Sequence, residues 1–207
     1  INNAAVIALP DRKLTKQGYK ANWSQSFWAF LPNLLVVALV VKSASPRIIN
    51  VSSKAVEFNG SDVDFDNINF ENGGYHPFTS YARSKTANVM FTKHLQTKFD
   101  RAKINAIALS LHPGTVRTEA VVKLSILPFV VSSTIIDSFI NVFHEITRRR
   151  CSDDIVHYII EGVEVSKGFV LQRMQNLPDK NDKSRDTEKE ERLWKISENV
   201  FHIKFDI

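Results

Sequence analysis

Hydrophobic side chains recur at two different spacings in the first half of the chain, and this pattern predicts alternating strands and helices. Residues 1–9 predict the end of a strand. The runs at 47–51 and 103–111 are rich in Ile, Val, Leu and Ala and predict two buried strands. Residues 78–99 carry apolar side chains at successive four-residue steps and predict a long helix between those strands. Its apolar face includes Phe91, Leu95 and Phe99.

Another helix is predicted between Thr15 and Ser45, where the following Pro46 ends it. Pro32 lies inside this pattern, so we expect a kink or a local break there. The next few residues are apolar all round, which predicts burial on more than one side. The positions that share the apolar face are Trp23, Phe27, Phe30, Leu31, Leu34, Leu35 and Ala38.

The order strand, helix, strand, helix, strand predicts parallel strands joined by right-handed crossovers, and hence an α/β sheet covered by helices. A polar loop is expected at residues 54–74. The second half is less regular: residues 124–143 predict an apolar helix, 168–172 an outer strand and 190–201 a final amphipathic helix. Residues 178–193 are charged with mixed sign and predict a solvated loop.

The composition, with 43% hydrophobic and 24% charged residues, is that of a globular protein. The net charge of +5 is spread along the chain, and its one dense basic cluster, residues 148–150, predicts a solvated helix end and no nucleic-acid site. The single cysteine, Cys151, has no disulfide partner and no metal-ligand spacing around it, which fits an intracellular compartment and predicts no metal site. The most apolar run, residues 34–41, is far shorter than the roughly twenty residues of a membrane-spanning helix.

Two residues with complementary chemistry, Tyr81 and Lys85, lie four positions apart on the helix predicted at 78–99. At this spacing the phenol and the ammonium are neighbours on one helix face. A phenol has an ordinary pKa near 10, and a nearby cation lowers the pKa by favouring the phenolate. Such a pair suits a proton-transfer group, but the spacing often arises by chance on a helix, so the interpretation depends on the segments around it.

Two further polar segments converge on the same edge of the sheet. Ser52 and Ser53 follow the strand at 47–51, and residues 112–118 follow the strand at 103–111. The carboxyl ends of parallel strands form one edge, which is where open α/β folds bind ligands. Pro113 and Gly114 predict a tight turn in the second segment, and His112 beside them is interpreted as a structural neighbour.

The segments N-V-S-S, Y-x-x-x-K and H-P-G-x-V-x-T, in this order and spacing, resemble the short-chain dehydrogenase/reductase family. The phrases PRIINVSS, SYARSKTANVMFTKHL, LSLHPGTVRTE and ERLWKISENV resemble its retinol-dehydrogenase-like and WW-domain-oxidoreductase-like branch. The opening N-N-A-A is similar to the N-N-A-G motif of the family. The resemblance covers nearly the whole chain and implies a Rossmann-like parallel sheet with helices on both faces.

The resemblance also implies a role for each matching residue. Tyr81 would be the general acid/base, Lys85 would lower its pKa and bind the nicotinamide ribose, and Ser53 rather than Ser52 would polarise the substrate carbonyl. Residues implied to bind the cofactor are Asn3 and Ala4 near the adenosine ribose, Tyr81 and Lys85, and Pro113, Gly114, Val116 and Thr118 at the nicotinamide end.

The implied reaction is hydride transfer between a nicotinamide cofactor and a carbonyl or alcohol carbon of a small apolar substrate such as a retinoid. The cofactor would be NADP or NAD, and the resemblance to this branch favours NADP. Residues 1–207 would form one partial nucleotide-binding domain, in which 119–148 covers the substrate. The protein would lie in the cytoplasm or on an intracellular membrane, with the long helices as a homodimer interface. Residues 124–143 are interpreted first as core packing, with an apolar substrate pocket and a membrane contact as the alternatives.

Three features depart from the family pattern. The Gly-rich T-G-x-x-x-G-x-G loop, which lets backbone amides approach the pyrophosphate, is absent from the sequence, so the first strands of the domain are expected to be lacking as well. The active-site Asn of the family is replaced by Ser24 or Ser26, depending on where a short deletion falls. Ala5 replaces a glycine, which adds only a methyl group.

Two hypotheses for function follow. The first is an oxidoreductase read from an incomplete sequence, and Ser53, Tyr81 and Lys85 favour it. The second is a truncated, non-catalytic relative that acts as a binding or interaction protein. The missing Gly-rich loop, the missing Asn and the apolar helix around Pro32 favour the second.

Overall fold

The computed structural model describes residues 1–6, 9–16, 18–19, 21, 23, 27, 42–44, 46–112, 186–202 and 204. By its internal contacts the chain divides into one unit of residues 1–112 and 166–207 and another of residues 113–165, and every described residue belongs to the first. No helix within the described ranges is long and apolar enough to cross a membrane.

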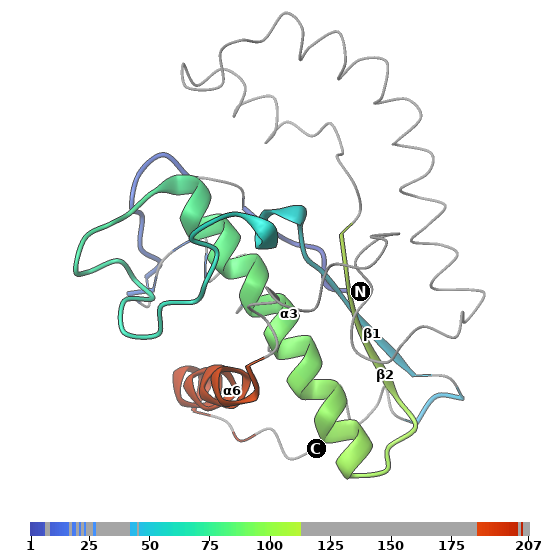
Figure 1. The fold of residues 1–207 in the computed structure, drawn as a ribbon. Helices are drawn as coiled ribbons and strands as arrows, with labels where there is room; N and C mark the ends of the chain where they lie inside the picture. Colours follow the sequence, from blue (N-terminus) through green and yellow to red (C-terminus); the bar gives the residue numbers. More distant parts are fainter. Residues whose placement is uncertain are drawn as a thin grey trace, which may run out of the picture. The chain divides into compact units, whose positions relative to one another are not determined.

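The centre of the described unit is a pair of parallel strands, β1 (Arg47–Val51) and β2 (Ile107–Leu111), joined by the long helix α3 (Pro77–Arg101) (Figure 1). Their register places Asn50 opposite Ser110. Asn2 lies on the other side of β1: its N–H donates to the Ile49 carbonyl at 2.7 Å, and its carbonyl accepts from the Val51 N–H at 2.9 Å. The N-terminal segment thus extends the sheet by one parallel bridge.

Helix α3 begins and ends where the sequence supplies the signals for it. His76 is the N-cap and accepts a hydrogen bond from the Thr79 N–H through its ring, and Pro77 occupies the first turn, where its missing N–H costs nothing. Beyond the C-cap, Ala102, the chain leaves the helix through Lys103, whose φ of 54° is left-handed. The strand predicted from residue 103 therefore begins later, at Ile107, because the chain first has to turn back.

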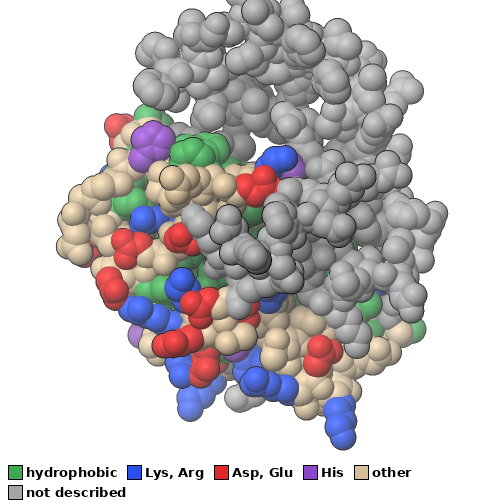
Figure 2. Space-filling view, viewed as in Figure 1, with side chains coloured by type: hydrophobic (Ala, Val, Ile, Leu, Met, Phe, Trp, Pro, Cys, Tyr) green, Lys and Arg blue, Asp and Glu red, His purple; other side chains and the backbone are tan. Residues whose placement is uncertain are grey.

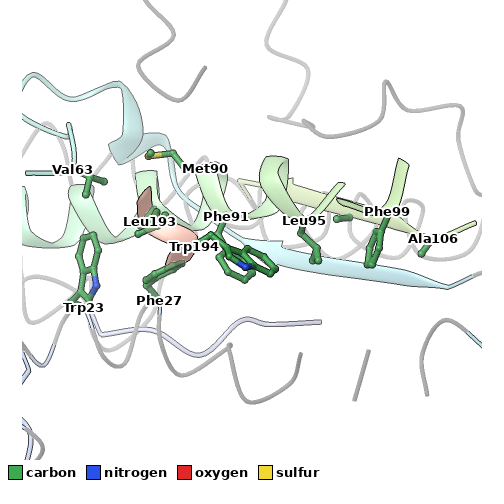
Figure 3. Close-up of a cluster of buried hydrophobic side chains, with 12 residues drawn as sticks. Trp23, Phe27, Val63, Met90, Phe91, Leu95, Phe99, Ala106, Leu193 and Trp194 are labelled. Atoms are coloured by element: carbon green, nitrogen blue, oxygen red, sulfur yellow. The ribbon is translucent and has the colours of Figure 1, made fainter. Parts of the chain in front are cut away.

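One hydrophobic cluster holds α3, the N-terminal segment and the last helix, α6 (Thr187–Phe201), together (Figure 3). The Phe91 ring lies between the Phe27 ring, at 5.7 Å in an edge-on arrangement, and the Trp194 ring, at 4.8 Å in a stacked one. Trp23 and Phe27, predicted to share a helix face, are both buried in this cluster. Its members are Trp23, Phe27, Val63, Ala87, Met90, Phe91, Leu95, Phe99, Ala106, Ala108, Leu193 and Trp194.

Two expectations for loops are corrected. The polar loop at 54–74 opens with a short 3₁₀ helix, η2 (Lys54–Glu57). The amphipathic helix predicted at 190–201 is confirmed, and residues 187–189, expected to lie in a charged loop, form its first turn after the Asp186 cap. The elements expected at 124–143 and 168–172, the kink at Pro32 and most of the first helix lie outside the described residues.

Ion pairs join α6 to its neighbours and to itself. Arg192 contacts Asp66 in the loop before α3, and Lys195 binds Glu191 one turn away at 2.7 Å. On the face that Figure 2 shows, acidic and basic side chains of the described residues are interspersed. Such exposed pairs contribute little individually, so we attribute the docking of α6 to its apolar side.

The N-cap of α6 gives a first testable expectation. The Asp186 carboxylate accepts from the N–H groups of Glu188 and Lys189, both at 3.1 Å. Asp186→Ala removes these acceptors, so we expect the melting temperature to fall by a few degrees. Asp186→Asn keeps an acceptor and serves as the control. Equal melting temperatures for Asp186→Ala and the unchanged protein, measured by circular dichroism, would contradict the capping role.

Candidate active site

The candidate site forms where β1 ends and α3 begins. Ser53 follows the last residue of β1 by two positions and is the N-cap of η2, where its Oγ accepts from the Ala55 N–H at 3.2 Å. Tyr81 and Lys85 lie on the first turns of α3, on the side that packs against β1 and η2. Ser53, Tyr81 and Lys85, far apart in sequence, are thus brought together.

The Tyr81 phenol is 8% exposed and forms a side-chain hydrogen bond with Ser53. Burial raises the pKa of Tyr81 above its ordinary 10.0, because the phenolate would lose water, and the Ser53 hydrogen bond opposes this rise. The pKa of Tyr81 thus lies above its ordinary value, because burial outweighs the Ser53 hydrogen bond. The expected lowering of this pKa by Lys85 stays a prediction.

The Lys85 ammonium is almost fully enclosed, with 2% of the residue exposed. Its Nζ donates to the Val51 carbonyl at 2.8 Å and lies 5.8 Å from the centre of the Tyr81 ring. Burial lowers the pKa of Lys85 to about 8. The Val51 bond accounts for one of the three N–H donors of an ammonium. Lys85 is therefore next to Tyr81 but is anchored on the strand.

The two serines after β1 have different environments. Ser52 is 3% exposed and its Oγ donates to the backbone carbonyl of Lys85 at 2.9 Å, which ties β1 to α3. Ser53 is less deeply buried and contacts the Tyr81 side chain. This geometry places Ser53, not Ser52, beside the phenol.

The residues expected to bind the cofactor are only partly within the described ranges. Asn3 and Ala4 are both exposed and follow directly on Asn2, which pairs with β1. His112, at the end of β2, is partly buried, and burial together with nearby Lys54 lowers its pKa to about 4. Expected residues outside the described ranges are Pro113, Gly114, Val116 and Thr118, together with Ser24 and Ser26. In the described ranges no cluster of three or more His, Cys, Asp or Glu could hold a metal ion.

Sequence reasoning missed a set of buried polar residues that surround the site from the helix and strand sides. Asn50 on β1 donates to the Thr92 hydroxyl at 2.8 Å and accepts from Asn2 at 2.7 Å. Asn88, one turn beyond Lys85, is 1% exposed. The available signal was the row of polar side chains at positions 85, 88, 92 and 96, spaced to share one helix face.

The pKa of Lys85 predicts how stability depends on pH. Between about 8 and 10.5 the unfolded chain binds a proton at this lysine that the folded chain does not, so stability rises with pH across this interval. At about 1.4 kcal/mol per pKa unit, the contribution is on the order of 3 kcal/mol. Tyr81, whose pKa is raised, acts in the opposite direction above pH 10.

We expect urea titrations to show that the free energy of unfolding rises between pH 8 and 10, and that this rise is smaller in Lys85→Met. Parallel pH profiles for the two proteins would contradict this account.

No protein-family model matches the chain. Human retinol dehydrogenase 14 is 35% identical over 119 residues, which are 57% of this chain and 34% of that protein. Human retinol dehydrogenase 12 is 27% identical over 207 residues, which are 100% of this chain and 61% of that protein. A short-chain dehydrogenase/reductase of Armillaria gallica is 40% identical over 82 residues, 38% of this chain and 26% of that protein. The chain thus spans between about a third and three fifths of the length of the two human relatives.

Two solved structures share the fold. One, a protein of Mycobacterium paratuberculosis, has a TM-score of 0.67 and 21% identity over 100% of this chain and 67% of its own. The other, 4-hydroxyisoleucine dehydrogenase complexed with NADH, has a TM-score of 0.50 and 17% identity over 83% of this chain and 63% of its own. Likenesses at this level of identity show the fold alone, and they confirm the predicted α/β class with a Rossmann-like parallel sheet.

Proposed function

We propose that the chain is a member of the short-chain dehydrogenase/reductase family, in its retinol-dehydrogenase-like branch, and that the whole protein transfers hydride between NAD(P) and a carbonyl or alcohol carbon. The similarity to retinol dehydrogenases supports this proposal. The observation that carries this proposal is the buried pairing of Tyr81 with Ser53, beside the Lys85 ammonium. A proton donor, a second hydroxyl and a cation within one small site are the groups that a protein needs to protonate a carbonyl oxygen while the cofactor supplies the hydride.

The raised pKa of Tyr81 favours the reduction direction at neutral pH. The phenol holds its proton there and donates it to the substrate oxygen as the carbonyl carbon becomes an alcohol carbon. The Ser53 hydroxyl donates a hydrogen bond to the same oxygen, and Lys85 stabilises the phenolate that remains. Bound NAD(P)H supplies the hydride that this step needs.

The cofactor fits the residues present in two ways. Lys85 commits one of its three donors to Val51, so the ammonium has donors for ribose hydroxyl groups. The exposed Asn3 and Ala4 follow directly on the parallel bridge to β1. We propose NADP or NAD, with NADP favoured by the branch, and Pro113, Gly114, Val116 and Thr118 as further contacts of the nicotinamide end.

An apolar substrate fits the surroundings of the phenol. The Phe78 ring lies 6.4 Å from the Tyr81 ring and 4.9 Å from that of Phe58, which is 41% exposed. Such a wall favours a hydrocarbon body next to the reacting carbonyl. The names of the two human relatives point to retinol, and we propose retinoids or similar lipid-like carbonyl compounds as the substrate class.

The test uses the full-length protein that contains this chain. We expect it to oxidise NADPH or NADH in the presence of all-trans-retinal or decanal, measured by the fall in nicotinamide absorbance. Reduction should be fastest near neutral pH, and oxidation of the matching alcohol should accelerate as pH rises, because that direction needs Tyr81 deprotonated. Failure of both cofactors with every aldehyde and alcohol tried would overturn the proposal.

A further inference from the structure

The face of α3 that packs on the strands carries a row of buried polar side chains. Lys85, Asn88, Thr92 and Gln96 follow one another at three- and four-residue steps and therefore share one side of the helix. None of them is more than 4% exposed. Because a buried polar group is costly unless it is hydrogen-bonded, such a row fixes how the helix lies on the strands.

The far end of the row binds the strands directly. The Gln96 Oε1 accepts from the Ala108 N–H of β2 at 2.8 Å, and the Thr92 Oγ1 accepts from Asn50 of β1 at 2.8 Å. The Thr92 hydroxyl also donates to the backbone carbonyl of Asn88 at 2.6 Å. These bonds set the position of α3 along β1 and β2, and with it the position of Asn88.

At the N-terminal end of the row, two side chains donate to the same backbone oxygen. The Val51 carbonyl accepts from the Lys85 Nζ at 2.8 Å and from the Asn88 Nδ2 at 3.4 Å. A carbonyl oxygen has two lone pairs and can accept both bonds. Given these two distances, the ammonium and the amide nitrogen are at most about 6 Å apart, within the range at which a charge on one shifts the pKa of the other.

We propose that Asn88 is a positioning residue of the active site, which shares the Val51 carbonyl with Lys85 and thereby fixes the ammonium beside Tyr81. Among the described bonds, the Lys85 ammonium and the Asn88 amide are the two side-chain donors to the Val51 carbonyl. Without the amide, Lys85 alone would donate to this oxygen, and we expect the position of its ammonium to be fixed less tightly. The catalytic meaning of this role rests on the proposed function, whereas the pairing with Lys85 does not.

A packing role for Asn88 makes a different prediction. A residue that only fills the space between α3 and β1 would change stability without changing the titration of Lys85. The charged or titratable groups on the elements around this end of α3 include Tyr81 and Arg83 on the helix itself, Lys54 and Glu57 in η2, and His112 directly after β2. These groups stay the same in every variant proposed below, so a change in the Lys85 titration reports on Asn88.

The test measures the pKa of Lys85 by NMR in the full-length protein with ¹³C-labelled lysine, the signal being assigned by its loss in Lys85→Arg. We expect Asn88→Asp, which places a carboxylate next to the ammonium, to raise this pKa by at least about one unit. Gln96→Glu puts the same charge on the same buried face about 12 Å further along the helix, roughly 16 Å along the axis from Lys85, and should leave the Lys85 pKa nearly unchanged. Equal shifts in the two variants, or no shift in Asn88→Asp, would overturn the proposal.

A second variant keeps the proposal testable if Asn88→Asp does not fold. Asn88→Ala removes the amide and favours the helix, and we expect kcat to fall about tenfold with KM nearly unchanged. Thr97→Ala is the control, because the Thr97 hydroxyl lies outside the row and donates only to the Lys93 carbonyl of the same helix among the described bonds, and it should keep its kcat. An unchanged kcat in Asn88→Ala would refute the positioning role. The NMR measurement needs no turnover, so an inactive unchanged protein would refute the proposed function and still leave the role of Asn88 decided by the Lys85 titration.

Discussion

Replacing Tyr81 by Phe should lower kcat/KM for carbonyl reduction by about 10³-fold and leave the fold intact. The substitution removes one hydroxyl, and with it the proton donor and the hydrogen bond to Ser53. The ring remains and keeps its contact with Phe78. Steady-state kinetics of the full-length protein with NADPH and all-trans-retinal measure the effect, and circular dichroism checks the fold.

Tyr75→Phe is the matched control. Tyr75 lies in the loop before α3, and its hydroxyl donates to the Leu9 carbonyl and not to a residue of the Ser53, Tyr81 and Lys85 set. We expect the same chemical change at this position to leave kcat/KM within about twofold. Retained activity in Tyr81→Phe, with normal folding, would remove Tyr81 from the mechanism.

The second large effect is expected from Phe91→Ala, which should lower the free energy of unfolding by about 3–5 kcal/mol. Phe91 is 5% exposed and its ring contacts the rings of Phe27 and Trp194, so its loss leaves a cavity and breaks two aromatic contacts at once. For a domain of ordinary stability this is a large fraction of the total. Urea titration by tryptophan fluorescence and circular dichroism measures it.

Phe58→Ala is the control for that substitution. Phe58 is 41% exposed, and its described ring contact is with Phe78, so its truncation creates no buried cavity. We expect a loss of about 1 kcal/mol or less. A similar loss in both variants would show that Phe91 does not join α3 to α6 and the N-terminal segment in the way described.

The elements with a strong local pattern could be predicted from the sequence. The strand at 47–51 has the bounds expected for it, and the long helix extends only slightly beyond residues 78–99. The first three residues of α6, 187–189, were missed because they belong to a charged stretch, and their helical structure depends on the Asp186 cap and on packing of the later apolar residues. Charge alone did not distinguish a solvated helix face from a loop.

The candidate site also has features that the sequence predicts and features that depend on the tertiary structure. The nearness of Tyr81 and Lys85 follows from helix geometry, and the place of Ser53 follows from its position after a strand. The pKa of Tyr81 could not be predicted from this spacing, because its direction depends on burial, which the tertiary structure sets. The hydrogen bonds from Asn50 to Thr92 and from Asn88 to Val51 depend on how α3 docks on β1. Only the helical spacing of the polar residues indicated them.

Transfer of a labelled hydride tests the central claim most directly. The full-length protein is incubated with all-trans-retinal and NADPH or NADH that carries deuterium at C4 of the nicotinamide on either face, and the alcohol is analysed by mass spectrometry. We predict an alcohol with one deuterium on its carbinol carbon from one labelled face, and loss of this product in Tyr81→Phe. Absence of deuterated alcohol with both cofactors and both faces would contradict the assignment of this chain to a hydride-transferring enzyme.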